Sequence, residues 1–205
     1  MAFLENLIKS VVLGKGPFQI EKVWDEMFAT CIESPHGLAA AGGVNAAMWD
    51  IVGKNLGVPV YKLLGGDYEK PITPYAGTYT MGWRELNDMG SLVEEAKKFV
   101  KMGYKAIKLR GGRGLPKHQE DVASVKAVRE EFGDDIDVLM DANGGYITES
   151  AAVSTARQLE KYNLFWLEDP VYDPEGKARV EAQVDVPIHS GGDYGSRGRF
   201  DLKNS

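Results

Sequence analysis

Residues 136–168 read IDVLMDANGGYITESAAVSTARQLEKYNLFWLE. The apolar runs 136–140 and 164–167 each predict a strand. Between them, the helical apolar spacing of 149–162 predicts a helix, with Thr148 as its N-terminal cap. Parallel strands need a crossover of this kind because a tight turn cannot join them. The stretch therefore predicts one strand–helix–strand unit of an α/β protein.

The same alternation continues on both sides of this unit. Further strands are expected at residues 72–79, 105–110 and 187–189, and further helices at 91–102, 117–132 and 175–183. Strands that alternate with helices, without a clear period of two, indicate a parallel sheet covered on both faces. Both a closed (β/α)₈ barrel and an open doubly wound sheet are built in this way.

The glycine pattern favours the barrel. A doubly wound nucleotide-binding sheet carries Gly-x-Gly-x-x-Gly after its first strand, and no such motif occurs there. The segment Gly111-Gly112-Arg113-Gly114 lacks the Lys-Ser/Thr ending of a phosphate-binding loop. We interpret this segment as a loop at the mouth of a barrel.

The first seventy residues have a different pattern. Helical apolar spacing over 20–31 and 38–56 predicts two helices, and Gly57 ends the second. Glycines and prolines between residues 65 and 74 mark the change to alternating strands and helices. The predicted organisation is a helical segment at 1–70, followed by barrel units at 71–205.

Three acidic residues each follow a short apolar run. Asp141, Glu168 and Asp193 are 27 and 25 positions apart (168 − 141 and 193 − 168). This period is about the length of one strand, one helix and two short loops, so each carboxylate is expected at the carboxyl end of a successive parallel strand. Oxygen donors that converge there suit Mg²⁺, which prefers carboxylate and water ligands.

Two cations precede the first acid by one unit. Lys108 and Arg110 are two positions apart, so both point to the same side of their strand. If Lys108 faces the barrel interior, both approach the metal from the neighbouring strand. A lysine beside a divalent cation and an arginine is expected to have a lowered pKa, which makes it a usable base. Such an assembly can remove the α-proton of a carboxylate substrate and stabilise the enediolate that forms.

Composition excludes several other classes. The chain is 43% hydrophobic and 26% charged, as in an ordinary globular protein. Its net charge is −6 and its basic residues are interspersed with acids, so no nucleic-acid partner is expected. The first ten residues carry Glu5 and Lys9 and predict neither a signal peptide nor a membrane span. A single cysteine, Cys31, is typical of a reducing compartment, so a cytoplasmic location is expected.

Four segments carry a resemblance to a known family. They are AAAGGVNAAMWDIVGKNLGVPVYKLLGG at 39–66, VLMDAN at 138–143, WLEDP at 166–170 and GGD at 191–193. Together they resemble the mandelate racemase and muconate lactonizing enzyme branch of the enolase superfamily. The resemblance extends over essentially the whole chain. It implies a partial (β/α)₈ TIM barrel that follows a helical remnant of the N-terminal capping domain.

The resemblance also implies roles for particular residues. Asp141, Glu168 and Asp193 correspond to Mg²⁺ ligands, although glutamate is usual at the third position. Lys108 and Arg110 correspond to the catalytic Lys-x-Lys motif of the second barrel strand. The second lysine of that motif is usually the base, and an arginine hardly loses a proton. This departure leaves Lys108 to bind the substrate carboxylate. A further residue, two positions after the first ligand, is assigned to substrate binding; it is Asn143.

The implied activity is Mg²⁺-dependent abstraction of the α-proton of a small carboxylate or sugar-acid substrate. Acid-sugar dehydration is the first expectation, with racemisation or cycloisomerisation second. Family members have a strand-rich capping region and continue past the third ligand, whereas residues 72–205 amount to roughly half of a barrel of about 250 residues. Two alternatives follow. The chain is a non-catalytic half-barrel that forms a homo-oligomer or pairs with a missing half, or it binds metal without turnover.

Overall fold

The computed structural model describes residues 2–31, 35–66, 71–78, 89–112 and 118–191. These residues form two compact units, which divide between Pro71 and Ile72. Each unit has its own cluster of buried apolar side chains. In the described ranges, no helix is both long enough and apolar enough to cross a membrane.

The first unit is helical, as the sequence predicted. Its described elements are α1 (Ala2–Leu7), a π-helical turn (Ile8–Val12), α2 (Ile20–Cys31), α3 (Pro35–Leu56) and α4 (Val60–Leu63). Helix α2 contributes Val23, Met27 and Cys31 to the core of this unit, all fully buried, because they repeat at the spacing of one helical face. Burial raises the pKa of the Cys31 thiol.

The second unit alternates strands with helices. In chain order these are β1 (Ala76–Gly77), α5 (Met89–Lys101), β2 (Ala106–Arg110), α6 (His118–Phe132), β3 (Asp137–Asp141), α7 (Glu149–Leu159), a 3₁₀ turn (Glu160–Tyr162), β4 (Trp166–Glu168), α8 (Pro174–Glu181) and β5 (Ile188–His189). The cap of α7 is confirmed, since the Thr148 hydroxyl accepts a hydrogen bond from the Ala151 amide at 3.2 Å. The first strand is shorter than the predicted 72–79.

The five strands are all parallel, and their spatial order β1-β2-β3-β4-β5 is the order of the chain. A doubly wound sheet reverses its strand order at a switch point, and this sheet does not. The fold is therefore a segment of a (β/α) barrel.

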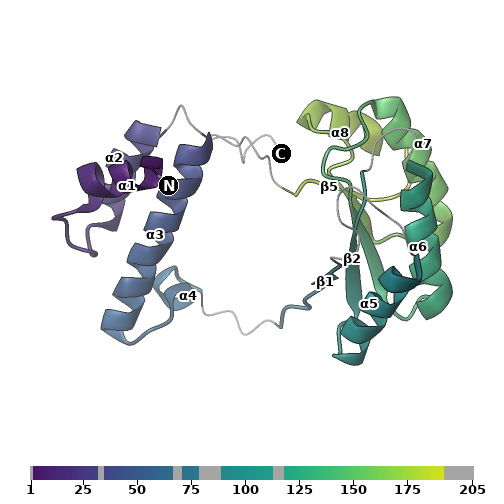
Figure 1. Cartoon of the computed structure of the whole chain (residues 1–205), viewed down its shortest axis with the longest axis horizontal. Helices are drawn as coiled ribbons and strands as arrows, with labels where there is room; N and C mark the ends of the chain where they lie inside the picture. Colours follow the sequence, from purple (N-terminus) through teal and green to yellow (C-terminus); the bar gives the residue numbers. More distant parts are fainter. Residues whose placement is uncertain (1, 32–34, 67–70, 79–88, 113–117, 192–205) are drawn as a thin grey trace. The chain divides into compact units, whose positions relative to one another are not determined.

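Helices α5 to α8 lie on one face of this sheet (Figure 1). Five apolar strand residues point toward these helices, and all are 0% exposed: Ile107, Leu109, Val138, Met140 and Leu167. The described helices of this unit cover only that face, so the expected covering of both faces holds for one side. In a barrel the other face is the interior, which side chains fill, and this explains why period-2 patterning is weak.

Two βα loops pack backbone against backbone at the carboxyl end of the sheet. Gly112, with a φ of 75°, lies so close to the Ala142 carbonyl that a Cβ would overlap it. Asp121 of α6 is fully buried and links the loops, because its carboxylate accepts hydrogen bonds from the Gly112 amide at 2.8 Å and the Tyr146 hydroxyl at 2.9 Å. The loops that follow β2 and β3 are thereby fixed to each other.

Candidate metal centre

The strand register places three polar side chains in one row at the carboxyl end of the sheet. Arg110 of β2 pairs with Asp141 of β3, which pairs with Glu168 of β4. Residues that pair directly in a parallel sheet point to the same face. Asp141 and Glu168 are buried, with 9% and 7% exposure. These two carboxylates therefore lie side by side, as their spacing in the sequence predicted.

A third carboxylate completes a buried acidic cluster. Oxygen atoms of Asp141, Glu168 and Asp169 all lie within 4.8 Å of one another. Clustered carboxylate oxygens are the hard donors that a cation such as Mg²⁺ prefers, and water or substrate fills its other positions. The remaining predicted ligand, Asp193, lies outside the described residues.

Asp169 was missed because it immediately follows Glu168. Successive residues on a strand point to opposite faces, so the pattern places Asp169 on the helical side. The strand ends at Glu168, however, and Asp169 adopts a φ of 43°, which turns its side chain back toward the other acids. Backbone hydrogen bonds to His189 at 2.9 Å and from Gly144 at 2.6 Å hold this turn. The motif WLEDP includes Asp169, but a sequence motif does not show which way this side chain points.

Lys108 lies on the same face of the sheet as the acids, two residues before Arg110 on β2. Its Nζ is 2.7 Å from Glu168 Oε2 and 3.2 Å from Asp141 Oδ2. The ammonium also lies 5.4 Å from the centroid of the Tyr75 ring. Burial lowers the pKa of Lys108, but the hydrogen bond to Glu168 and the charge of Asp141 together outweigh it, so the pKa is raised. Without a cation the carboxylates dominate the surroundings of this amine, and the lowering predicted beside a bound Mg²⁺ stays a prediction.

Asn143 and Arg110 were also predicted site residues. The Asn143 backbone amide donates to Asp141 Oδ1 at 3.0 Å, and its side-chain amide donates to the Asp141 carbonyl at 3.4 Å. Asn143 therefore helps to orient the first acid, and its contact with substrate stays a prediction. Arg110 is half-buried on the same strand face as Lys108.

A second lysine reaches the cluster from the helical layer. Lys177 of α8 is 2.7 Å from Asp169 Oδ1 and 3.0 Å from Ser190 Oγ. Asp169 Oδ1 also accepts a hydrogen bond from the Gly191 amide at 3.2 Å. A Cβ at Gly191 would overlap the Glu168 carboxylate, so a larger residue here would require this side chain to move. The cluster therefore contains three acids and two lysines.

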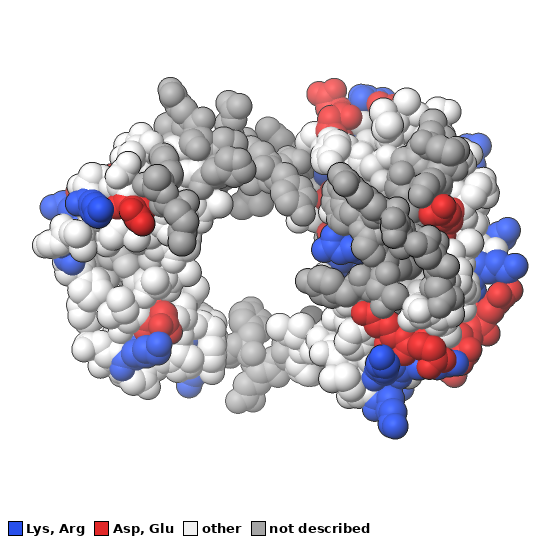
Figure 2. Space-filling view, in the orientation of Figure 1, with Lys and Arg blue, Asp and Glu red and all other residues white. Residues whose placement is uncertain are grey.

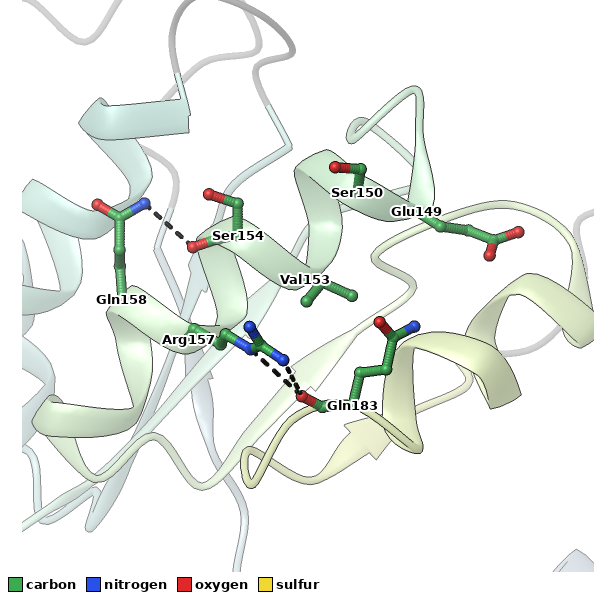
Figure 3. Close-up of a pocket in the computed structure, with 7 residues that line it drawn as sticks. All are labelled: Glu149, Ser150, Val153, Ser154, Arg157, Gln158 and Gln183. Atoms are coloured by element: carbon green, nitrogen blue, oxygen red, sulfur yellow. Dashed lines mark hydrogen bonds between the residues drawn. The ribbon is translucent and has the colours of Figure 1, made fainter.

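The surface also carries a groove of about 770 Å³, shown in Figure 3. It is lined by Glu149, Ser150, Val153, Ser154, Arg157, Gln158 and Gln183. These residues come from α7 and, for Gln183, from the segment after α8, so the groove lies on the helical layer and shares no residue with the acidic cluster. On the face shown in Figure 2, the described basic side chains lie among acidic ones.

The parallel sheet and the acidic cluster at its carboxyl end define a (β/α)-barrel protein with a candidate metal centre. A family model described as "Enolase C-terminal domain-like" matches residues 91–201. A second, "Mandelate racemase / muconate lactonizing enzyme, N-terminal domain", matches residues 2–65. The chain belongs to the mandelate racemase and muconate lactonizing enzyme family of the enolase superfamily, as its motifs predicted.

Named relatives carry several activities. The chain is 36% identical to arabinonate dehydratase of Saccharolobus solfataricus over 90% of its own length and 49% of that protein. It is 32% identical to an N-succinyl-L-Arg/Lys racemase of Bacillus cereus, over 90% of the chain and 47% of the racemase. The chain thus spans about half the length of the curated relatives it matches.

Solved structures show the same fold. A racemase from Streptomyces coelicolor A3(2) with bound magnesium matches with a TM-score of 0.80 and 32% identity, over 93% of this chain and 54% of that one. A variant of L-talarate/galactarate dehydratase, liganded with Mg and L-glucarate, matches with a TM-score of 0.78 and 28% identity, over 93% and 48% of the two chains.

Proposed function

We propose that this chain contributes the metal-binding part of an active site that removes the α-proton of a carboxylate substrate with the help of Mg²⁺. The observation that carries the proposal is the convergence of buried carboxylates from β3 and β4 around the Lys108 ammonium. Dehydration of an acid sugar is the first choice, supported by the dehydratases among its relatives. Racemisation or cycloisomerisation is the second, supported by the racemases and a cycloisomerase.

Asp141 and Glu168 are the proposed Mg²⁺ ligands, with Asp193 as the third. Asp141 and Glu168 occupy neighbouring strands at the same level and present their oxygens to one point. Gly191, two positions before Asp193 in the sequence, donates a hydrogen bond to Asp169, while Asp193 itself lies outside the described residues and is proposed from its motif alone.

Lys108 and Arg110 are the proposed groups that meet the substrate. When bound, Mg²⁺ acidifies the α-proton and offsets the negative charge that develops as the proton leaves. Lys108 is assigned as a cation that binds the substrate carboxylate, because its ammonium lies on the face of the sheet that carries the proposed ligands. Arg110 adds a second, permanent positive charge from the same strand face. Both side chains orient an anionic substrate over the acidic cluster.

The proposal is tested by hydrogen exchange at the substrate α-carbon. We expect proton NMR in deuterium oxide to show Mg²⁺-dependent loss of the α-proton signal from at least one of a panel of aldonates and aldarates. Replacement of Lys108 by Met is expected to slow this exchange by about 10²-fold or more, because loss of one positioned group that stabilises developing negative charge costs about that much. Lys126→Met is the matched control, since Lys126 forms an exposed pair with Glu130 outside the cluster.

Two results would contradict the proposed chemistry. If no substrate exchanges its α-proton although Mg²⁺ binds, the function is metal binding without turnover. If Lys126→Met slows exchange as much as Lys108→Met does, the Lys108 effect is not specific to the site.

A second candidate function is assembly through the face of the sheet that the described helices of its own unit leave uncovered. Three rings lie next to one another on this face: Tyr75 and Trp166 with centroids 6.0 Å apart, and Trp166 and His189 at 4.9 Å. Tyr75 is 43% exposed. Aromatic side chains on such a surface favour contact with another chain. We expect light scattering after size-exclusion chromatography to show a dimer that Tyr75→Glu converts to a monomer; a monomeric unsubstituted chain would contradict this.

A further inference from the structure

We propose that Lys177 is a positioning residue that holds the Asp169 carboxylate out of the coordination sphere of the proposed cation. This inference rests on the proposed Mg²⁺ site and adds to it a residue from the helical layer. Lys177 lies in α8, where a lysine usually projects into solvent. Here the side chain is buried and its ammonium contacts the acidic cluster.

The geometry of Asp169 gives this ammonium a specific task. Both members of the Lys177–Asp169 pair are buried, with side-chain exposures of 8% and 10%. One carboxylate oxygen, Oδ1, meets the Lys177 ammonium and accepts a hydrogen bond from the Gly191 amide. Asp169 Oδ1 thus has two donors directed at it, whereas each Asp141 oxygen has one among the described residues, the Asn143 amide or the Lys108 ammonium. Both lone pairs of Asp169 Oδ1 are therefore engaged, which makes it a poorer metal ligand than either Asp141 oxygen. Asp169 thus stays beside the cluster, held by its ion pair with Lys177.

The Lys177–Asp169 ion pair connects the ends of the neighbouring strands β4 and β5. Lys177 also contacts Ser190, and the Asp169 amide donates to the His189 carbonyl, so β4 and the segment after β5 are tied through one ion pair. Ser190 and Gly191 lead directly to Asp193, the proposed third ligand. The pair therefore fixes Ser190 and Gly191 beside Asp169 and offsets one negative charge in the field that the cation meets.

The charge balance predicts opposite results for the two partners. Lys177→Met removes a positive charge and frees Asp169, so we expect calorimetry to show Mg²⁺ binding about tenfold tighter than in the unsubstituted chain. Asp169→Asn removes a negative charge and leaves the ammonium uncompensated, so Mg²⁺ binding is expected to be about tenfold weaker. The double variant Lys177→Met/Asp169→Asn restores the balance and is expected to return to the original affinity.

Each alternative has its own outcome. If Asp169 is itself a ligand, the double variant stays as weak as Asp169→Asn, and the inference is overturned. If Lys177 only supports the fold, Lys177→Met lowers the melting temperature and leaves the Mg²⁺ affinity unchanged or weaker, which also overturns it. Should Lys177→Met fail to fold, the comparison of Asp169→Asn with the double variant still decides. Lys126→Met is the control for charge alone. An unsubstituted chain that binds no Mg²⁺ refutes the proposed function instead.

Discussion

Replacement of Glu168 by Gln is expected to weaken Mg²⁺ binding by about a hundredfold or more. Glu168 is buried at the end of β4, and its carboxylate lies beside Asp141 and the Lys108 ammonium. The amide keeps the shape of the side chain but removes the charge that binds a hard cation. Loss of groups that merely orient metal ligands already costs about 10- to 100-fold, so loss of a ligand should cost at least that much. Isothermal titration calorimetry with MgCl₂ measures the effect.

Glu149→Gln is the matched control for this experiment. The Glu149 carboxylate accepts hydrogen bonds from Arg179 Nε and Nη2 at the start of α7, outside the acidic cluster. Its replacement removes the same charge from the same unit and should change Mg²⁺ affinity less than about twofold, because exposed charges are screened. Asp141→Asn should match Glu168→Gln. Equal effects of Glu149→Gln and Glu168→Gln would show that only net charge matters, and the ligand assignment would fail.

The second large effect is on stability. Gly112→Ala is expected to lower the free energy of unfolding by about 3 kcal/mol or more. A left-handed φ costs an L-residue roughly 1–2 kcal/mol, and the added Cβ would also overlap the Ala142 carbonyl, which must shift. The Gly112 amide bonds the buried Asp121 carboxylate, so this shift would strain a second contact. Urea denaturation followed by circular dichroism measures the change.

Gly133→Ala separates the two causes. Gly133 has a φ of 57° and no atom within 4 Å of its ideal Cβ position, so it carries the conformational cost without the overlap. We expect it to lower stability by about 1 kcal/mol. If both variants lose the same free energy, the close packing of the two βα loops does not contribute, and the loop arrangement described above is wrong in detail.

The parts of the site that the sequence predicted are those that depend on regular spacing. Asp141 and Glu168 follow apolar runs one βα unit apart, and a parallel sheet necessarily places such residues side by side. Lys108 and Arg110 follow from the two-residue repeat of a strand. For the same reason the strand–helix alternation was read correctly along the second unit. Regular geometry converts position in the chain directly into position in space.

The parts that were missed depend on irregular backbone or on contacts between layers. Asp169 joins the cluster only because its φ is 43°, a value that a strand pattern does not predict. From the sequence alone, Lys177 is expected to be a solvent-exposed helical lysine, because its burial depends on how α8 packs. The effect of Asp141 and Glu168 on the pKa of Lys108 also depends on side-chain contacts between strands. Each of these features depends on backbone geometry or on packing that a periodic pattern does not specify.

The strand order has a consequence for how this unit assembles. Every strand pairs with the strand that precedes or follows it in the chain, so all sheet contacts close loops of similar, moderate length. Such a sheet can grow one βα step at a time, and its cooperativity is carried by nearest neighbours, as in a repeat array. The acids stand on adjacent steps, β3 and β4. A cation bound by both acids would link the β3 and β4 units into one cooperative folding unit, whereas β1 and α5 would still unfold independently.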